Sequence, residues 1–193
     1  MARLFLIGLL AVCFLLVSCD KDDDKEDIVI EDIEVMDIDD YAELYFPDAK
    51  PVEGLGMYVI ITDEGSGDPV KDGDLLYTYY VGKLLDKSPA EATKFDSTYA
   101  RAHPDSIATQ AKVLSFQLDL KAKDDDGKER VRQFIDGWYR GFSQLKFGSK
   151  AIFLIPDSLA YGDTRRGIIP PNAALMFEVD LLKIKYPCYE GVF

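Results

Sequence analysis

The sequence has few of the residues from which metal centres, disulfide frameworks and nucleic-acid contacts are built. Its 193 residues include three cysteines, one histidine and one tryptophan. So few sulfur and imidazole groups leave little basis for a metal site, and none is expected. Basic residues are also scarce, at 22 Lys or Arg against 35 Asp or Glu, which gives a net charge of −13. Because phosphate binding needs clustered Lys and Arg, no nucleic-acid partner is expected.

The first 18 residues have the layout of a secretory signal. Arg3 precedes a continuous apolar run over residues 4–17, and this run is shorter than the roughly 20 residues that a membrane-spanning helix needs. The run ends in Leu16-Val17-Ser18-Cys19, which resembles the lipobox of bacterial lipoproteins, whose cysteine is lipidated after cleavage. We therefore interpret residues 1–18 as a lipoprotein signal peptide. A single N-terminal anchor helix is the alternative.

Cysteine usage agrees with lipidation of Cys19. Once Cys13 leaves with the leader and Cys19 is lipidated, only Cys188 is left, so no disulfide is expected in the mature chain. Each buried acyl CH₂ contributes about 0.8 kcal/mol, and two chains suffice for stable anchoring to a bilayer. We expect a lipid-anchored protein of the bacterial cell envelope, at the outer membrane, on either its periplasmic or its surface face.

Most of the negative charge lies near the N-terminus. Residues 19–45 contain 13 Asp or Glu and two Lys, whereas residues 46–193 contain 22 acidic and 19 basic residues. The charged run at 20–27 predicts a solvated spacer, with a signal for surface export or inner-membrane retention as the alternative. Asp39-Asp40 predicts a short capped helix that ends before Pro47. Residues 19–45 are thus interpreted as an acidic tether and an extension that packs on the domain.

Residues 46–193 have the composition and the hydrophobic pattern of one α+β domain. The chain is 48% hydrophobic and 12% aromatic, enough for a core. Trp138, Phe142 and Leu145 follow the i, i+4, i+7 spacing of one face of a short helix. Alternating or β-branched runs predict the strands, which are 57–62, 75–84, 95–98, 113–120, 150–155 and 174–184. Such a set predicts an antiparallel sheet packed on a helix.

Several short motifs become specific when they are taken together and in order. They are Tyr80-Val81-Gly82-x-Leu84, Phe95-Asp96-Ser97-Thr98, Gly137-Trp138-x-x-Gly141, Gly148-x-Lys150-Ala151, Ile155-Pro156, Ala160-Tyr161-Gly162, and Ile169-Pro170-Pro171-Asn172-Ala173 within a stretch from Gly167 to Leu182. This ordered set resembles the FKBP-type peptidyl-prolyl cis–trans isomerases. The resemblance extends over about residues 54–184, most of the mature chain.

The resemblance implies a fold and a pocket. The family fold is an antiparallel sheet of five or six strands wrapped around one short helix, with an apolar proline pocket between them; here an N-terminal extension precedes it. Asp96, Trp138 and Tyr161 are the implied catalytic residues. The implied substrate-binding residues are Tyr80, Phe95, Phe116, Phe134, Ile135, Ile169 and Phe177. In the family the tryptophan ring forms the pocket floor, the N–H at Ile135 and the Tyr161 hydroxyl hold ligand carbonyls, and Asp96 would accept a hydrogen bond from Tyr80.

The implied reaction is rotation about an X–Pro amide bond. Its barrier is about 18–20 kcal/mol, and no bond is made or broken, so no nucleophile, metal or cofactor is needed. A dry aromatic bowl disfavours the polar planar amide relative to the twisted transition state. The expected function is a peptidyl-prolyl cis–trans isomerase that assists protein folding in the cell envelope, acting as a monomer on proline-containing polypeptides.

Some features leave other interpretations open. Taken singly, each aromatic residue could be an ordinary core side chain, and Asp96 could be a turn-capping carboxylate. The segments 85–94, 99–113 and 121–132 are longer than in compact family members. The short flap at 162–167 contains Arg165-Arg166, which either favours an acidic residue near the proline or is simply solvated. The alternative is an FKBP-like binding module or chaperone with weak turnover; a structural surface lipoprotein would have no use for the pocket.

Overall fold

Antiparallel strands make up most of the regular structure. The computed structural model describes residues 33–98, 112–121 and 132–182. Its elements are α1 (Ile38–Tyr45), β1 (Tyr58–Asp63), β2 (Leu75–Leu84), β3 (Lys94–Ser97), β4 (Leu114–Gln117), α2 (Asp136–Phe142), β5 (Lys150–Ile155), the 3-10 turn η1 (Asp157–Leu159) and β6 (Leu175–Leu181). The predicted α+β class and the antiparallel sheet are confirmed.

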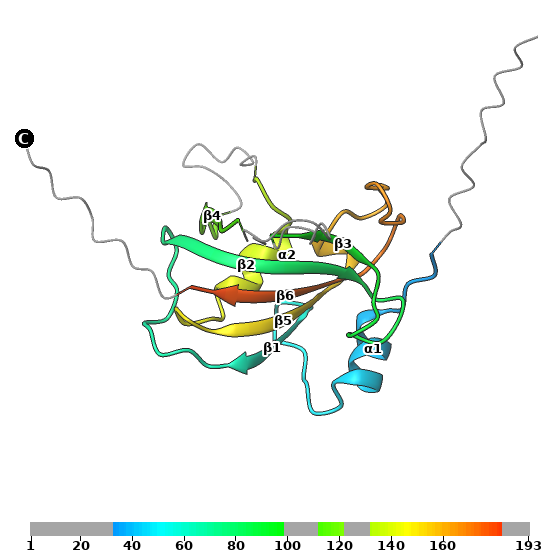
Figure 1. The fold of residues 1–193 in the computed structure, drawn as a ribbon, viewed down its shortest axis with the longest axis horizontal. Helices are drawn as coiled ribbons and strands as arrows, with labels where there is room; N and C mark the ends of the chain where they lie inside the picture. The colour runs from blue at the N-terminus through cyan, green and yellow to red at the C-terminus, as the bar shows by residue number, and fades with distance from the viewer. Residues whose placement is uncertain (1–32, 99–111, 122–131, 183–193) are drawn as a thin grey trace, which may run out of the picture. The chain divides into compact units, whose positions relative to one another are not determined.

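Within the described ranges the strands join one six-stranded sheet, in the order β1-β5-β6-β2-β3, with β4 also paired to β2 (Figure 1). The long strand β2 has room for two partners on one side. β4 pairs with its first half at Leu75–Thr78, and β3 pairs with its second half at Val81–Lys83. The sheet is open and does not close into a barrel, and the concave space beside β2 and β6 accommodates α2.

Alternation along the strands divides their side chains between two clusters. In β5, Phe153 and Ile155 belong to the larger cluster with α2, whereas Leu154 belongs to a smaller cluster with α1. β6 divides in the same way, with Phe177 in the larger cluster and Met176 in the smaller one. This is the two-residue period of a strand that is buried on both faces. The sheet therefore has one helix on each face.

Two glycines allow α2 to lie very close to β5. A Cβ on Gly137 would stand 2.4 Å from Cγ2 of Ile155, and one on Gly141 would stand 2.8 Å from the Phe153 ring. Glycine within a helix costs about 1 kcal/mol relative to alanine, so these positions are explained by packing and not by helix propensity. The close approach brings Trp138, which is 2% exposed, against the sheet.

The opposite face is covered by α1 together with the enlarged segment 85–94. Tyr41 of α1 is fully buried, and its hydroxyl donates to the carbonyl of Lys87 at 2.9 Å. Leu85 and Ala92 of the same segment are buried in the α1 cluster. This enlargement thus completes the packing of the N-terminal helix and stays on the face away from Trp138.

Candidate active site

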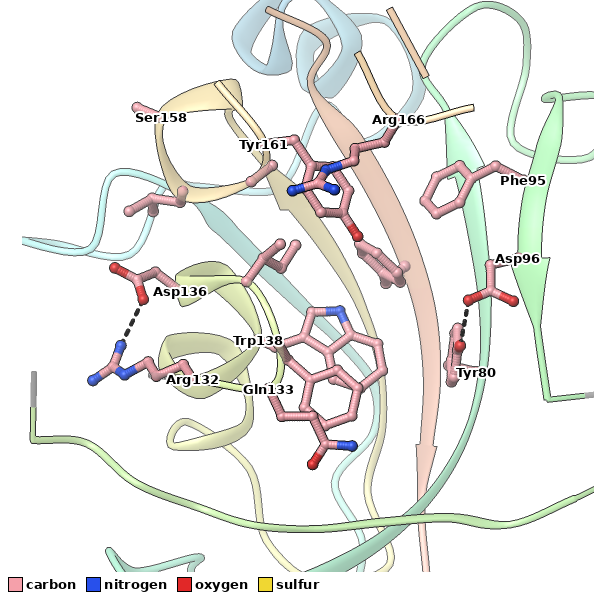
Figure 2. Close-up of a pocket in the computed structure, with 15 residues that line it drawn as sticks. Tyr80, Phe95, Asp96, Arg132, Gln133, Asp136, Trp138, Ser158, Tyr161 and Arg166 are labelled. Atoms are coloured by element: carbon pink, nitrogen blue, oxygen red, sulfur yellow. Dashed lines mark hydrogen bonds and ion pairs between the residues drawn. The ribbon is translucent and has the colours of Figure 1, made fainter. Parts of the chain in front are cut away.

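A pocket of about 550 Å³ opens between α2, the inner face of the sheet and the segment that follows β5. Figure 2 shows the indole of Trp138 at its centre, Tyr161 and Arg166 above the indole, and Asp96 with Tyr80 at one side. The lining residues come from six places along the chain: Tyr80, Phe95, Asp96, Arg132, Gln133, Phe134, Ile135, Asp136, Trp138, Ser158, Leu159, Ala160, Tyr161, Arg166 and Phe177.

Most of the residues that the sequence predicted for one pocket do lie around it. The eight that line it are Tyr80, Phe95, Asp96, Phe134, Ile135, Trp138, Tyr161 and Phe177. Phe116 lies behind the lining, with its ring centroid 5.2 Å from Phe134 and 5.8 Å from Trp138. Ile169 is 5% exposed and belongs to the core cluster. Cys19 and most of the enlarged segments 99–113 and 121–132 lie outside the described residues.

The other lining residues are Arg132, Gln133, Asp136, Ser158, Leu159, Ala160 and Arg166. Of these, only Arg166 was singled out in the sequence, as part of the Arg165-Arg166 pair of the flap. Gln133, Asp136 and Ala160 are direct sequence neighbours of predicted pocket residues, so adjacency is a signal that could have found them. Nothing in the sequence indicates that the guanidinium group of Arg132 reaches the pocket, because this depends on the path of its backbone segment. For Arg166 the position on the flap was a signal, but it did not distinguish Arg166 from Arg165.

Aromatic rings enclose Trp138 on several sides. Phe134 stacks on the indole with centroids 4.8 Å apart and an interplanar angle of 13°. Tyr80 and Phe177 approach it edge-on, at 4.9 Å and 5.2 Å. Phe95 in turn contacts Phe177 edge-on at 5.6 Å. These distances and tilts are the favourable geometries of aromatic pairs, so the rings form one interlocked, rigid wall.

Gly82 makes room for part of that wall. A Cβ at this position of β2 would stand 2.6 Å from the Phe95 ring and 3.0 Å from the Phe177 ring. The glycine of the Tyr80-Val81-Gly82 motif is therefore needed for close approach of the rings. Any side chain there would displace the two rings that bound the pocket on the β3 side.

Asp96 orients Tyr80 at the side of the pocket. The Tyr80 hydroxyl donates to Oδ2 of Asp96 at 2.6 Å, and the N–H of Ser97 donates to Oδ1 at 2.8 Å. Burial, followed by the hydrogen bond that the Tyr80 hydroxyl donates to Asp96, raises the pKa of Tyr80 well above its usual value. Tyr80 is thus a neutral donor that is already satisfied, and the expected bond between these two side chains is present.

Several other donors at the pocket have no acceptor among the residues that the structure describes. Nε1 of Trp138 and Nε of Arg132 are buried and unpartnered. The Tyr161 hydroxyl and the backbone N–H of Ile135, the residue that precedes α2, likewise form no hydrogen bond there. Burial raises the pKa of Tyr161, against an opposing effect of Arg166, so its hydroxyl stays protonated near neutral pH. Unsatisfied buried donors are rare and call for an acceptor, whereas the Tyr161 hydroxyl and the Ile135 N–H belong to half-buried residues that line the pocket, where a ligand carbonyl can approach them.

The two arginines of the pocket differ in their surroundings. Nη1 of Arg132 donates to Oδ1 of Asp136 at 2.7 Å, and its Cζ lies 4.8 Å from the centroid of the Tyr139 ring. Arg166 lies over the ring of Tyr161, with Cζ 5.6 Å from its centroid. Arg132 is therefore paired with a carboxylate of the domain, whereas Arg166 lies beside the unpartnered hydroxyl of Tyr161.

No group of three or more His, Cys, Asp or Glu that could hold a metal ion occurs within residues 33–98, 112–121 and 132–182. Over the same ranges, none of the helices has the length and hydrophobicity needed to cross a membrane.

Comparison with known proteins places this arrangement in a family. Residues 67–182 match the family model described as FKBP-type peptidyl-prolyl cis-trans isomerase. The chain is 33% identical over 130 residues to "FKBP-type peptidyl-prolyl cis-trans isomerase FkpA" of Escherichia coli (strain K12), and the match covers 67% of this chain and 38% of FkpA. It is 34% identical to "FK506-binding protein 2" of Debaryomyces hansenii, over 67% of this chain and 78% of that protein.

Solved structures show the same fold. The crystal structure of FkpA from Escherichia coli superposes with a TM-score of 0.54 at 30% identity, over 75% of this chain and 54% of that one. The crystal structure of AtFKBP13 superposes with a TM-score of 0.50 at 26% identity, over 70% of this chain and 97% of that one. In sequence the match covers 38% of FkpA of Escherichia coli (strain K12) and 41% of FkpA of Aeromonas hydrophila, so the chain spans less than half the length of these two relatives.

Proposed function

The chain belongs to the family of FKBP-type peptidyl-prolyl cis-trans isomerases, and on that basis we propose that its pocket binds prolyl peptides and catalyses rotation about the X–Pro bond. The observation that supports this most strongly is the chemistry of the pocket. Its aromatic wall suits a pyrrolidine ring, and its unpartnered groups are donors, as peptide carbonyls require. The alternative function, binding without turnover, is an outcome of the test below.

The proposed catalysis rests on differential stabilisation of a twisted amide. In the planar ground state the amide is polar because of resonance; in the twisted transition state that polarity is reduced. A pocket walled by Trp138, Phe177 and Phe95 offers little solvation to the planar form and disfavours it relative to the twisted one. Trp138 and Phe177 are only 2% and 4% exposed, so water has little access to these two rings.

The polar residues are then assigned to orientation. Tyr161 O–H and the N–H of Ile135 would hold carbonyls on either side of the proline ring. Asp96 would fix the Tyr80 ring, through the 2.6 Å hydrogen bond, as one side of the pocket. Phe134 would stack on the Trp138 indole as part of the lining, and Phe116 and Ile169 would support the lining from the core. No proton transfer is required of any of them.

The experiment is NMR exchange spectroscopy on a Leu-Pro peptide, whose cis and trans signals interconvert faster when the isomerase is present. We expect acceleration by the wild-type protein and a large loss with Trp138→Ala. A matched control is Tyr79→Phe, because Tyr79 lies on the other face of β2 and lines no part of this pocket. Absence of acceleration, combined with a peptide-dependent change in the fluorescence of Trp138, would instead identify a binding module.

We further propose that the protein is a lipid-anchored monomer of the bacterial envelope, organised as signal peptide (1–18), acidic tether and extension (19–45) and isomerase domain (46–193). The bacterial FkpA relatives support a bacterial setting, and the apolar run before Cys19 supports export and lipidation. Cys19→Ala should release the protein from the membrane fraction and abolish incorporation of labelled fatty acid. Retention of Cys19→Ala at the membrane would rule out this anchor.

A further inference from the structure

Arg166 is held near the pocket by a tight backbone turn. Its N–H donates to the carbonyl of Ile169 at 3.1 Å, and the N–H of Ile169 donates to the carbonyl of Arg166 at 2.9 Å. Gly167 within this turn has a φ of 57°, in the left-handed region that favours glycine. Ile169 is packed in the core cluster. The backbone of Arg166 is therefore anchored to the core, although its side chain is exposed.

The guanidinium of Arg166 is exposed and has no counterion in the described part of the chain. It lies across the Tyr161 ring, an arrangement that the negative face of the ring favours (Figure 2). None of the ion pairs between described residues involves Arg166. Arg132, by contrast, is paired with Asp136 at 2.7 Å. Of the two cations that line the pocket, Arg166 is the one able to take an anionic partner from a substrate.

Asp96, which also lines the pocket, has the opposite charge. Asp96 is exposed there, and its two oxygens accept from Tyr80 and from the N–H of Ser97. A substrate carboxylate would be repelled on the Asp96 side and attracted on the Arg166 side. The charges across the pocket therefore favour one placement of an acidic side chain.

We propose that Arg166 selects prolyl peptides in which the residue before the proline is Asp or Glu, an inference that rests on the proposed isomerase function. The Tyr161 hydroxyl, which has no described partner, is the donor for the carbonyl of that residue. Because the guanidinium lies on the same tyrosine ring, the side chain next to this carbonyl is within its reach. A guanidinium matches a carboxylate in shape and can donate two parallel hydrogen bonds to it.

The large negative charge of the whole chain does not oppose this preference strongly. Residues 46–193 contain 22 acidic and 19 basic residues, so the domain is close to neutral, and most of the excess lies in residues 19–45. At physiological ionic strength, charges further apart than roughly 8 Å are largely screened. A carboxylate in contact with Arg166 is therefore attracted more strongly than it is repelled by charges beyond that range.

The test compares peptides that differ only before the proline, Glu-Pro against its neutral isostere Gln-Pro, by NMR exchange spectroscopy. For the wild-type protein we expect the ratio of kcat/KM for Glu-Pro to that for Gln-Pro to be about two to five, the range of an exposed ion pair. In Arg166→Gln the ratio should fall to about one. Arg166→Lys should keep part of the preference, because lysine keeps the positive charge but lacks the planar guanidinium that donates two parallel hydrogen bonds. The matched control is Arg165→Gln, which removes the same charge one residue away and outside the lining.

Two further comparisons make the outcome decisive. Added salt should reduce the wild-type ratio, and a peptide with Glu three residues from the proline should behave like its Gln counterpart. A wild-type ratio of one, or an equal drop in Arg165→Gln, would overturn the proposal while the isomerase function stands, because both peptides are still turned over. If neither peptide is turned over, the proposed function itself fails and this inference fails with it.

Discussion

Removing the hydroxyl of Tyr161 separates a role in substrate orientation from a role in stability. In the described part of the chain this hydroxyl has no hydrogen-bond partner, so Tyr161→Phe breaks no internal bond. A neutral hydrogen bond to a substrate carbonyl contributes about 0.5–1.5 kcal/mol net, which corresponds to a loss of about two- to twelvefold in kcat/KM. The free energy of unfolding should change by less than about 0.5 kcal/mol, as for substitutions that break no internal contact.

Tyr80→Phe is the matched comparison, because this hydroxyl does have an internal partner. It donates to Asp96 at 2.6 Å, and its loss should lower the free energy of unfolding by about 1 kcal/mol, a figure at the low end because Asp96 is exposed and water replaces the donor. The assays are NMR exchange on a Leu-Pro peptide and denaturant unfolding of both variants. Unchanged turnover in Tyr161→Phe, or a stability loss as large as that of Tyr80→Phe, would refute the assigned role of Tyr161.

Three further predictions concern the scaffold. Gly137→Ala should destabilise the protein by about 1–3 kcal/mol in denaturant unfolding, because its Cβ would stand 2.4 Å from the buried Ile155; an unchanged midpoint would contradict the tight packing of α2. Tyr41→Ala should lower the free energy of unfolding by about 3 kcal/mol or more, since the ring is fully buried, yet peptide binding followed by Trp138 fluorescence should persist in the folded fraction; loss of binding would show that α1 supports the pocket. The hydrogen bond from Tyr58 to Asp39, with burial, raises the pKa of Tyr58 from 10.0 to about 12. The stability that the neutral hydroxyl contributes is therefore complete below pH 10 and is lost between about pH 10 and 12. Tyr58→Phe should flatten this alkaline decline in the free energy of unfolding, and an unaltered decline would argue against the hydrogen bond.

Local patterns predicted the elements well where a single face decides the packing. The spacing of Trp138, Phe142 and Leu145 predicted one helical face. All three are buried, but α2 ends at Phe142, so Leu145 lies beyond the helix. The alternation of residues 113–120 predicted a strand, but β4 ends at Gln117. Beyond that point Leu118 exchanges hydrogen bonds with the backbone of Gly73 and Asp74, so the alternating pattern continues to direct side chains although the strand ladder has ended.

The composition of the pocket was less predictable, for a physical reason. The aromatic residues of the motifs converge because β-pairing fixes the register of their strands, and the structure brings most of them to one cavity. Whether a residue lines the cavity or supports the lining from the core depends on how deeply its side chain is buried, which the sequence does not specify. Phe116 and Ile169 are buried one layer behind the lining residues. The sequence did not distinguish Arg165 from Arg166. Only Arg166 lines the pocket, beside the turn at Gly167, whose φ is 57°.

The most direct measurement is a set of intermolecular nuclear Overhauser contacts between a bound Leu-Pro peptide and the protein. Trp138 is the only tryptophan in the chain, so its indole signals are unambiguous. The proposed function predicts contacts from the proline ring protons to Trp138, Phe177 and Phe95. Contacts confined to the opposite face of the sheet, at Tyr79 and Val81, would contradict it.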